Sequence, residues 1–487
     1  MRRLFALLSL AAFVLGASAC RQQPEGAAKI VVIGGTPALR DPADDALTTP
    51  EAVLLQNVGQ GLVSFDANGN IVGGLAERWN VSDDGLSYIF RLATTKWPDG
   101  RKITAQQVAR LLKREIGPHS KNPIKDTLGA VDDIVAMTDR VIEIRLTAPR
   151  PNLLAVLAQP ELGIVRNDLG AGPYSIDPKA AIPGTLRLVR DVLSPDETVT
   201  RKEEVLVSGA DAGGAIQGFI AGKTDLVLGG TFADLPYAQR AKLPRDSLRF
   251  DPAAGLFGLV AVHAGSDFDN ADLRRLLSQA INRDGLVAAL GVPGLAPRAT
   301  VLEAGLDGIG PPAAPAWLGV PMDARLSTLL AEAARIFGSK PRPTIRLLLP
   351  VGPGGDVLLR QLRSDWGALG FTVDRATNGS DADFRLIDAV APSTSPAWFV
   401  RELRCEMVPV CDPEADQLMD AARSASISQQ RYALIGQAAA KIDDQQLFIA
   451  LAAPVRWSLV SNRIQGFAGN RFAVHTLTNL MSKPAGD

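Results

Sequence analysis

Short apolar runs alternate with turn signals along the first part of the chain. Residues 29–34 (KIVVIG) form an apolar, β-branched run that ends at glycine, which is typical of a buried strand. Behind the start signal Thr49-Pro50-Glu51, apolar residues recur at helical spacing, so a helix of about ten residues is predicted there. Residues 62–65, 79–81 and 88–92 are predicted strands, the last two around a Ser-Asp-Asp-Gly turn. The pattern predicts a small α+β unit behind an opening strand.

The second half of the chain alternates helical and strand periodicity. The predicted elements are helix 326–337, strand 344–349, helix 356–369 and strand 371–374. Gly370 provides a helix C-cap, and the order favours a sheet covered by helices. Residues 351–355 (VGPGG) lack the third glycine of a dinucleotide-binding fingerprint, so a tight turn is predicted there. If the helix start behind this turn faces a cleft, it can hold a ligand carboxylate.

The first twenty residues have the order of an export signal. Arg2 and Arg3 precede the apolar run 4–15, and the small residues 16–19 precede Cys20. This order is typical of a segment removed during export, and the apolar run is too short to cross a bilayer. We therefore expect an exported protein whose body lies outside the cytoplasm.

The cysteine behind these small residues resembles the lipobox of bacterial lipoproteins, in which that cysteine is acylated. The usual leucine is replaced by Ala17, so plain cleavage after Ala19 is the alternative. We expect residues 1–20 to be a lipoprotein signal peptide with Cys20 as the lipid attachment site. Residues 21–28 are expected to be a flexible tether.

Composition excludes some partners. The chain has 487 residues, of which 46% are hydrophobic. This length is too great for one ordinary domain. The net charge is −1 and basic residues are scattered, so no nucleic-acid partner is expected. The chain has no G-x-S-x-G, H-E-x-x-H or P-loop motif, and His119, His263 and His475 lie far apart. An enzyme is therefore not predicted.

Two cysteines remain behind the export signal. Export places Cys405 and Cys411 in an oxidising compartment, where a disulfide between them is expected and free thiols are the alternative. A zinc site needs about four ligands, and the histidines are remote in sequence. No metal or other cofactor is predicted.

Long stretches of the chain resemble a known family. Residues 61–92 and 96–100 (KWPDG) resemble the N-terminal signature of the family-5 extracellular solute-binding proteins of bacterial ABC importers. Members of that family include oligopeptide-, dipeptide- and nickel-binding proteins. Three further stretches agree in order: 171–174 (AGPY), 273–284 (LRRLLSQAINRD) and 465–470 (QGFAGN). Within them we expect structural roles, with the arginines of 273–284 on a solvated helix face.

The resemblance implies an α/β chain with the type II periplasmic-binding-protein fold. In that fold two α/β lobes are joined by a hinge, with an extra α+β subdomain near the N-terminus. The resemblance places lobe I in residues 29–50, 163–252 and 466–487. It places the extra subdomain in residues 51–162 and lobe II in residues 253–465.

The resemblance also implies a function. It predicts a protein of the periplasm or cell envelope that captures a peptide or peptide-like solute by lobe closure. The solute is then delivered to an ABC permease and its ATPase subunits, with the lipid as the only membrane attachment. A monomer without cofactor is expected. The alternative is a binding-protein fold reused as a ligand sensor or envelope-assembly protein without transport.

The resemblance places the ligand loop behind a lobe II strand. In peptide-binding relatives an aspartate in this loop pairs with the α-amine of the peptide. Here Pro392 aligns with that position, so no acid stands there, and Asp388 four residues earlier is the candidate amine partner.

Four further residues are candidates for the wall of the ligand cleft. Trp398 and Phe399 are candidate apolar walls, and Arg404 and Arg471 are candidate carboxylate clamps. For the two rings the alternative is lobe II core, and for the two arginines it is surface charge.

Overall fold

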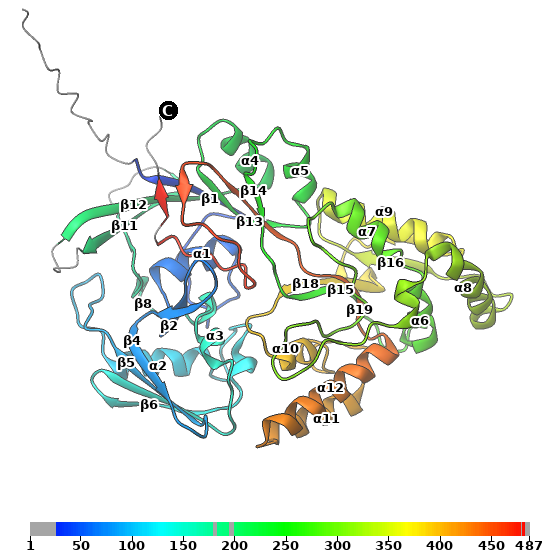
Figure 1. The fold of residues 1–487 in the computed structure, drawn as a ribbon, viewed down its shortest axis with the longest axis horizontal. Helices are drawn as coiled ribbons and strands as arrows, with labels where there is room; N and C mark the ends of the chain where they lie inside the picture. The colour runs from blue at the N-terminus through cyan, green and yellow to red at the C-terminus, as the bar shows by residue number, and fades with distance from the viewer. Residues whose placement is uncertain (1–25, 179–182, 194–198, 479, 483–487) are drawn as a thin grey trace, which may run out of the picture.

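The computed structural model describes residues 26–178, 183–193, 199–478 and 480–482. Figure 1 shows two α/β lobes side by side, with a third, smaller unit adjoining both. The expected signal peptide, Cys20 and residues 21–25 of the tether lie outside the described residues. No helix of the described part is long and apolar enough to cross a membrane.

Lobe I is built around its opening strand. Ile30 and Val32 alternate with more exposed neighbours on β1, which lies parallel to β12 and β13. Helix α1 begins at a capping box in which Thr48 and Glu51 bond one another's backbone. The described strands form a seven-stranded sheet in the order β10-β11-β12-β1-β13-β20-β14. Elements of lobe I are β1 (Ala28–Ile33), β10 (Ser175–Ile176), β11 (Thr185–Leu193), β12 (Val199–Ala210), β13 (Leu226–Thr231), β14 (Leu248–Phe250), β20 (Arg456–Val460), β21 (Ile464–Gln465), β22 (Met481–Ser482), α1 (Thr49–Val58), α4 (Ala212–Ile220) and α5 (Leu235–Arg240).

Lobe II has a five-stranded sheet in the order β17-β16-β18-β15-β19, with helices packed over it (Figure 1). Every residue of β15 is buried, because apolar side chains pack on both of its faces. Its elements are β15 (Gly255–Ala261), β16 (Thr344–Leu348), β17 (Thr372–Arg375), β18 (Phe384–Val390), β19 (Ile449–Ala452), α6 (Ala271–Gln279), α7 (Arg283–Leu290), α8 (Met322–Phe337), α9 (Pro353–Gly367), α10 (Pro396–Arg401), α11 (Pro413–Ser424), α12 (Ser428–Gln445) and the short 3₁₀ helices η3 (Asp267–Asp269), η4 (Ala316–Gly319) and η5 (Gly379–Asp381).

The extra subdomain has its own core. Phe90 and Trp97 are buried at its centre, and the indole N–H of Trp97 donates to Gln107 at 3.1 Å. Its largest sheet has the order β4-β5-β7-β6. The elements are β2 (Val63–Phe65), β3 (Ile71–Gly73), β4 (Ala76–Val81), β5 (Ser87–Leu92), β6 (Val131–Thr138), β7 (Val141–Leu146), α2 (Ala105–Glu115), α3 (Leu153–Leu157), η1 (Lys125–Leu128) and η2 (Pro160–Leu162), with the hairpin β8 (Val165–Arg166) and β9 (Leu169–Gly170) behind them.

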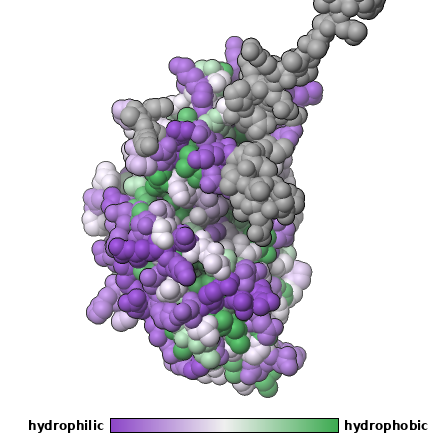
Figure 2. All heavy atoms as spheres, turned by 90° about the vertical axis from the view of Figure 1, so that its left-hand side faces the viewer, coloured by the Kyte–Doolittle hydropathy of each residue, from purple (hydrophilic) through white to green (hydrophobic). Residues whose placement is uncertain are grey.

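The outer face of the molecule on the side of this subdomain is mainly polar. Figure 2 shows hydrophilic side chains over most of its coloured surface, with small separate hydrophobic areas. Such scattered areas are normal for a folded surface and do not indicate a docking face.

Two short connections join the lobes. Residues 251–254 lead from β14 to β15, and residues 453–455 lead from β19 to β20. The second return comes earlier than the boundary at residue 465 predicted from sequence, because β20 already pairs with β13 and β14 in lobe I. The sequence motif at 465–470 follows this strand instead of opening the return.

Two arginines of lobe II correct the expectation of a solvated helix face. Arg274 and Arg283 are each only 2% exposed. Arg274 donates to the carbonyl oxygens of Gln445 and Phe268 at 3.1 and 2.9 Å, and Arg283 donates to that of Ala450 at 2.8 Å. Both guanidiniums are satisfied by backbone carbonyls, which allows the charges to be buried.

Candidate functional site

An ion pair spans the boundary of the lobes beside the two connections. Arg456 at the start of β20 donates from Nη1 to Oδ1 of Asp388 on β18 at 2.8 Å. Its Nη2 donates to the backbone carbonyl of Asp388 at 3.1 Å. The two side chains are only 15% and 18% exposed. Burial raises the pKa of the Asp388 carboxyl, and the Arg456 guanidinium opposes that rise.

The ion pair involves Asp388, the candidate amine partner selected from sequence. A solute amine would have to compete with Arg456 for the Asp388 carboxylate. The geometry therefore gives Asp388 a contact that joins the sheets of the two lobes.

The glycines behind β16 also contact lobe I. A Cβ on Gly354 would lie 1.8 Å from the carbonyl oxygen of Phe232, so only glycine fits there. The Gly354 amide donates to the Ala233 carbonyl at 2.8 Å. At this residue the start of α9 is therefore packed against lobe I backbone and does not face an open cleft.

The loop behind β18, residues 391–395, touches the extra subdomain. The Gln159 side-chain amide donates to the Pro392 carbonyl at 2.7 Å. The Thr394 hydroxyl lies 3.1 Å from Oδ1 of Asn152 and 2.8 Å from Oδ2 of Asp307. The segment in which sequence placed the amine anchor thus holds the subdomain to lobe II.

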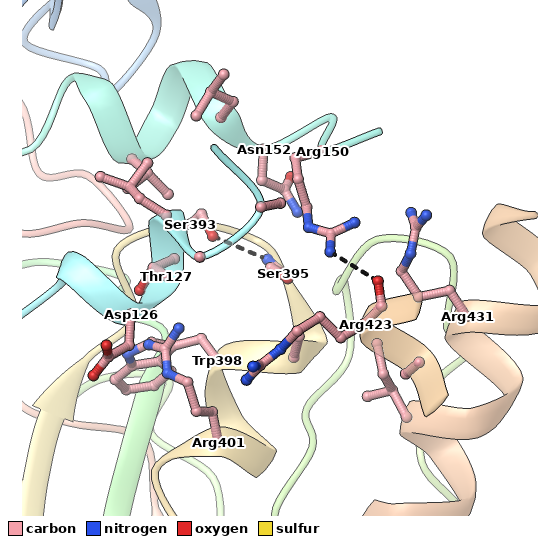
Figure 3. Close-up of a pocket in the computed structure, with 18 of the residues that line it drawn as sticks. Asp126, Thr127, Arg150, Asn152, Ser393, Ser395, Trp398, Arg401, Arg423 and Arg431 are labelled. Carbon is pink, nitrogen blue, oxygen red and sulfur yellow. Dashed lines mark hydrogen bonds between the residues drawn. The ribbon is translucent and has the colours of Figure 1, made fainter. Parts of the chain in front are cut away.

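A cavity of about 110 Å³ opens beside this loop, between the subdomain and helices α10 to α12. Drug-sized ligands occupy pockets of roughly 300 Å³ or more, so this space suits a group of a few atoms. Figure 3 shows polar side chains reaching toward it from η1, from the segment before α3, and from the three helices.

Positive charge dominates the lining. The charged lining residues are Asp126, Arg150, Arg401, Arg404, Arg423 and Arg431. Two of the arginines have acid partners: Arg401 lies 3.4 Å from Glu402, and Arg404 lies 2.9 Å from Asp420. Burial lowers the pKa of Arg401, and the carboxylate of Glu402 opposes that effect.

The structure brings together only some of the residues selected from sequence. Trp398 and Arg404 both line the cavity. Phe399 does not line it, because its ring is fully buried in the lobe II core, in edge contact with Trp398 at 5.1 Å. Arg471 lies elsewhere, 4.0 Å from Glu303.

Sequence reasoning missed four of the five lining arginines, namely Arg401, on the helix beside Trp398, and three others. Arg150, Arg423 and Arg431 come from distant segments. Arg431 lies 282 positions after Pro149, the neighbour of Arg150 in sequence. Each stands alone in its own segment, so no local motif indicates that they meet.

A disulfide joins Cys405 to Cys411 in the segment between α10 and α11. The Cys405 amide donates to Oδ2 of Asp416 at 3.2 Å, which ties this segment to α11 next to Arg404. In the described residues no group of three or more His, Cys, Asp and Glu side chains is placed to hold a metal ion.

Comparison with known proteins places the molecule in a family. The model of bacterial extracellular solute-binding proteins, family 5, matches residues 70–378. A probable di/tripeptide-binding protein 5 of Pseudomonas aeruginosa (strain UCBPP-PA14) is 26% identical over 88% of this chain and 90% of its own length. A probable deoxycholate-binding periplasmic protein of Escherichia coli (strain K12), YgiS, is 29% identical over 26% of this chain and 27% of its own length.

Solved structures agree on the fold. Haemophilus influenzae OppA in complex with the peptide RPPGFSPFR has a TM-score of 0.79 at 18% identity, covering 94% of this chain and 100% of that one. The Escherichia coli murein tripeptide binding protein MppA has a TM-score of 0.78 at 19% identity, covering 94% and 99%. The chain therefore has the type II periplasmic-binding-protein fold expected from sequence. Because the family model spans more than half of the chain, the protein belongs to the bacterial extracellular solute-binding proteins, family 5.

Proposed function

We propose that this protein captures a peptide or peptide-like solute by closure of its lobes and delivers it to the permease of an ABC importer. The observation that carries closure is the pair of short connections at residues 251–254 and 453–455, beside the ion pair of Asp388 and Arg456. Two short connections between rigid sheets allow rotation of one lobe against the other. A solute shifts the protein toward the closed state when it fits that state better.

The proposed class of solute is supported by the names of relatives and by the contacts of the loop behind β18. Relatives named for di- and tripeptides match nearly the whole chain. Pro392 occupies the aligned amine position, its carbonyl is bonded by Gln159, and Asp388 is paired with Arg456. A free α-amine therefore has no unpaired acid at either position, which favours a peptide-like solute held by other groups.

The mature chain works as a monomer without catalysis and without a cofactor, in the periplasm or cell envelope. Acylated Cys20 holds it at the membrane, and the permease with its ATPase subunits receives the solute. The order of charged, apolar and small residues before Cys20 supports the anchor.

The test is thermal unfolding of residues 21–487 against peptides, amino acids, opines, sugars and divalent metals. A solute at 100 times its Kd should stabilise the native state by about 2.7 kcal/mol and raise Tm. Small-angle scattering then measures the radius of gyration with each hit. A saturable Tm shift with a smaller radius supports the proposal, whereas saturable binding without compaction contradicts closure. If no solute shifts Tm, solute capture is contradicted.

A further inference from the structure

Three arginines of the cavity have no acid partner in the part of the chain that the structure describes. Arg150 and Arg431 contact backbone carbonyls, and Arg423 lies on the exposed end of α11. Among the described residues of the cavity lining, Asp126 is the only acid, and its charge acts on Arg401. The lining therefore carries positive charge that its own residues do not neutralise.

Backbone carbonyls hold two of these guanidiniums together and place the backbone of Arg423 beside them. Arg150 and Arg431 both donate from Nη1 to the Pro149 carbonyl, each at 3.0 Å. Nη2 of Arg150 donates to the Arg423 carbonyl at 3.4 Å (Figure 3). Arg150 belongs to the subdomain and the other two to lobe II, so like charges meet where the two bodies touch.

The surroundings make this arrangement unfavourable without a counter-charge. Burial first, and then the charges of Arg431 and Arg423, lower the pKa of Arg150 to about 10. Burial also lowers the pKa of Arg431, whose residue is only 5% exposed. Two lining donors also lack an acceptor: Thr127 Oγ1 and Arg431 Nε are buried without a hydrogen-bond partner. Buried donors normally have an acceptor.

We propose that this cavity binds an anionic group of the captured solute, a carboxylate or a phosphoryl group, between the extra subdomain and lobe II. The inference rests on the proposed solute-binding function and names the chemistry of one end of the solute. The cavity of about 110 Å³ fits such a group and not a whole peptide. Arginine presents several N–H donors in a plane, which suits both oxyanions. Because its donors come from both bodies, the anion bridges them.

The test titrates two probes, succinate and inorganic phosphate, against the mature chain at constant ionic strength balanced with chloride. Affinity is measured by calorimetry for the wild type, Arg423→Gln and Arg150→Gln. The matched control is Arg360→Gln, an exposed arginine on α9 that does not line the cavity. We expect saturable binding of at least one probe, weakened about tenfold or more by either cavity variant and unchanged by the control. The preferred probe identifies the group as carboxylate or phosphoryl.

The inference is overturned if neither probe binds saturably beyond chloride, or if Arg423→Gln binds both probes as the wild type does. Arg423 is exposed, so this variant should fold even if Arg150→Gln does not; circular dichroism of each variant checks folding. Failure of the anion-site proposal can be distinguished from failure of the proposed function. If library solutes compact the protein but anion binding is independent of arginine, the function stands and the anion site falls. If the anions bind through the arginines but no solute compacts the protein, the anion site stands and the function falls.

Discussion

Arg456 donates to both the side chain and the backbone carbonyl of Asp388, at 2.8 and 3.1 Å, across the boundary between the lobes. The third contact of this guanidinium is the carbonyl of Val455, within the second connection, at 2.9 Å. One side chain thus links β18 at the centre of the lobe II sheet, the connection itself and β20 of the lobe I sheet. A motion of the lobes must either keep this contact as a pivot or break it.

The first prediction follows from this pair. Arg456→Gln leaves a buried carboxylate without its counter-charge, which should lower the free energy of unfolding by about 3 kcal/mol. Urea unfolding measures it. The control is Arg335→Gln, which removes exposed ion pairs to Glu332 and Asp272 and should change stability by about 1 kcal/mol or less. Equal, small effects of the two changes would show that the cross-lobe pair does not stabilise the fold.

A second prediction concerns Arg283. Its guanidinium donates to the carbonyls of Ala450 and Ser278 and to the Ser278 hydroxyl, and it lies 5.1 Å from the Trp317 ring centre. Arg283→Ala leaves those carbonyls buried and unbonded, so unfolding free energy should fall by about 3 kcal/mol or more. Arg275→Ala on the neighbouring helix, where the side chain is 36% exposed, is the comparison and should cost about 1 kcal/mol. A stable Arg283→Ala protein would mean that the site repacks.

One buried acid, Glu115, and one partly buried acid, Asp443, predict a pH dependence. Burial raises the pKa of Glu115 and of Asp443 to about 7 each, and hydrogen bonds from Asn122 and from the Val301 amide oppose the rise only in part. Their unfolded pKa values lie near 4. Between about pH 4 and 7 the folded state therefore binds more protons than the unfolded state, and stability must fall as pH rises through that window.

The magnitude can be measured by urea unfolding at pH 5 and pH 8. Deprotonation of each group between pH 5 and pH 8 should lower the free energy of unfolding by about 2 kcal/mol. The double variant Glu115→Gln and Asp443→Asn should show a clearly smaller difference, because the amides do not titrate. A wild-type protein as stable at pH 8 as at pH 5 would contradict the assignment.

Much of the local structure could be predicted because it is encoded locally. The helix predicted from Thr49 is α1 (Thr49–Val58), and the strand predicted at 344–349 is β16 (Thr344–Leu348). Helix α9 begins at Pro353, three positions before the prediction, because proline suits the first helical turn. Gly370 ends this region with a φ of +84°, the conformation for which the sequence argument selected glycine.

The cavity could not be predicted because its chemistry depends on tertiary contacts. Sequence patterns indicate which helical positions are polar, but not which long polar side chains reach a carbonyl of another segment. The same limit explains why Arg283 was expected on a solvated face and is buried. Trp398 and Arg404 were selected through the family resemblance, which places the loop behind β18 near the ligand, and both line the cavity.

The last prediction tests whether the contact between subdomain and lobe II controls the cavity. The Gln159 side chain is buried and donates to the Pro392 carbonyl at 2.7 Å without lining the cavity. Gln159→Ala leaves that carbonyl unbonded, so the two bodies should separate more easily at a cost of about 1–3 kcal/mol. If an anion bridges them, its affinity should fall by roughly the same factor that weakens the contact, about tenfold, although no arginine has changed.

Calorimetry with the better of the two anion probes measures this effect. Gln106→Ala is the matched control, because its exposed amide bonds Asp139 at 3.2 Å within the subdomain alone. We expect the control to bind the probe as the wild type does. Unchanged affinity in Gln159→Ala would mean that the arginines hold the anion without help from the subdomain contact. In that case, the contact between the subdomain and lobe II would not be coupled to anion binding.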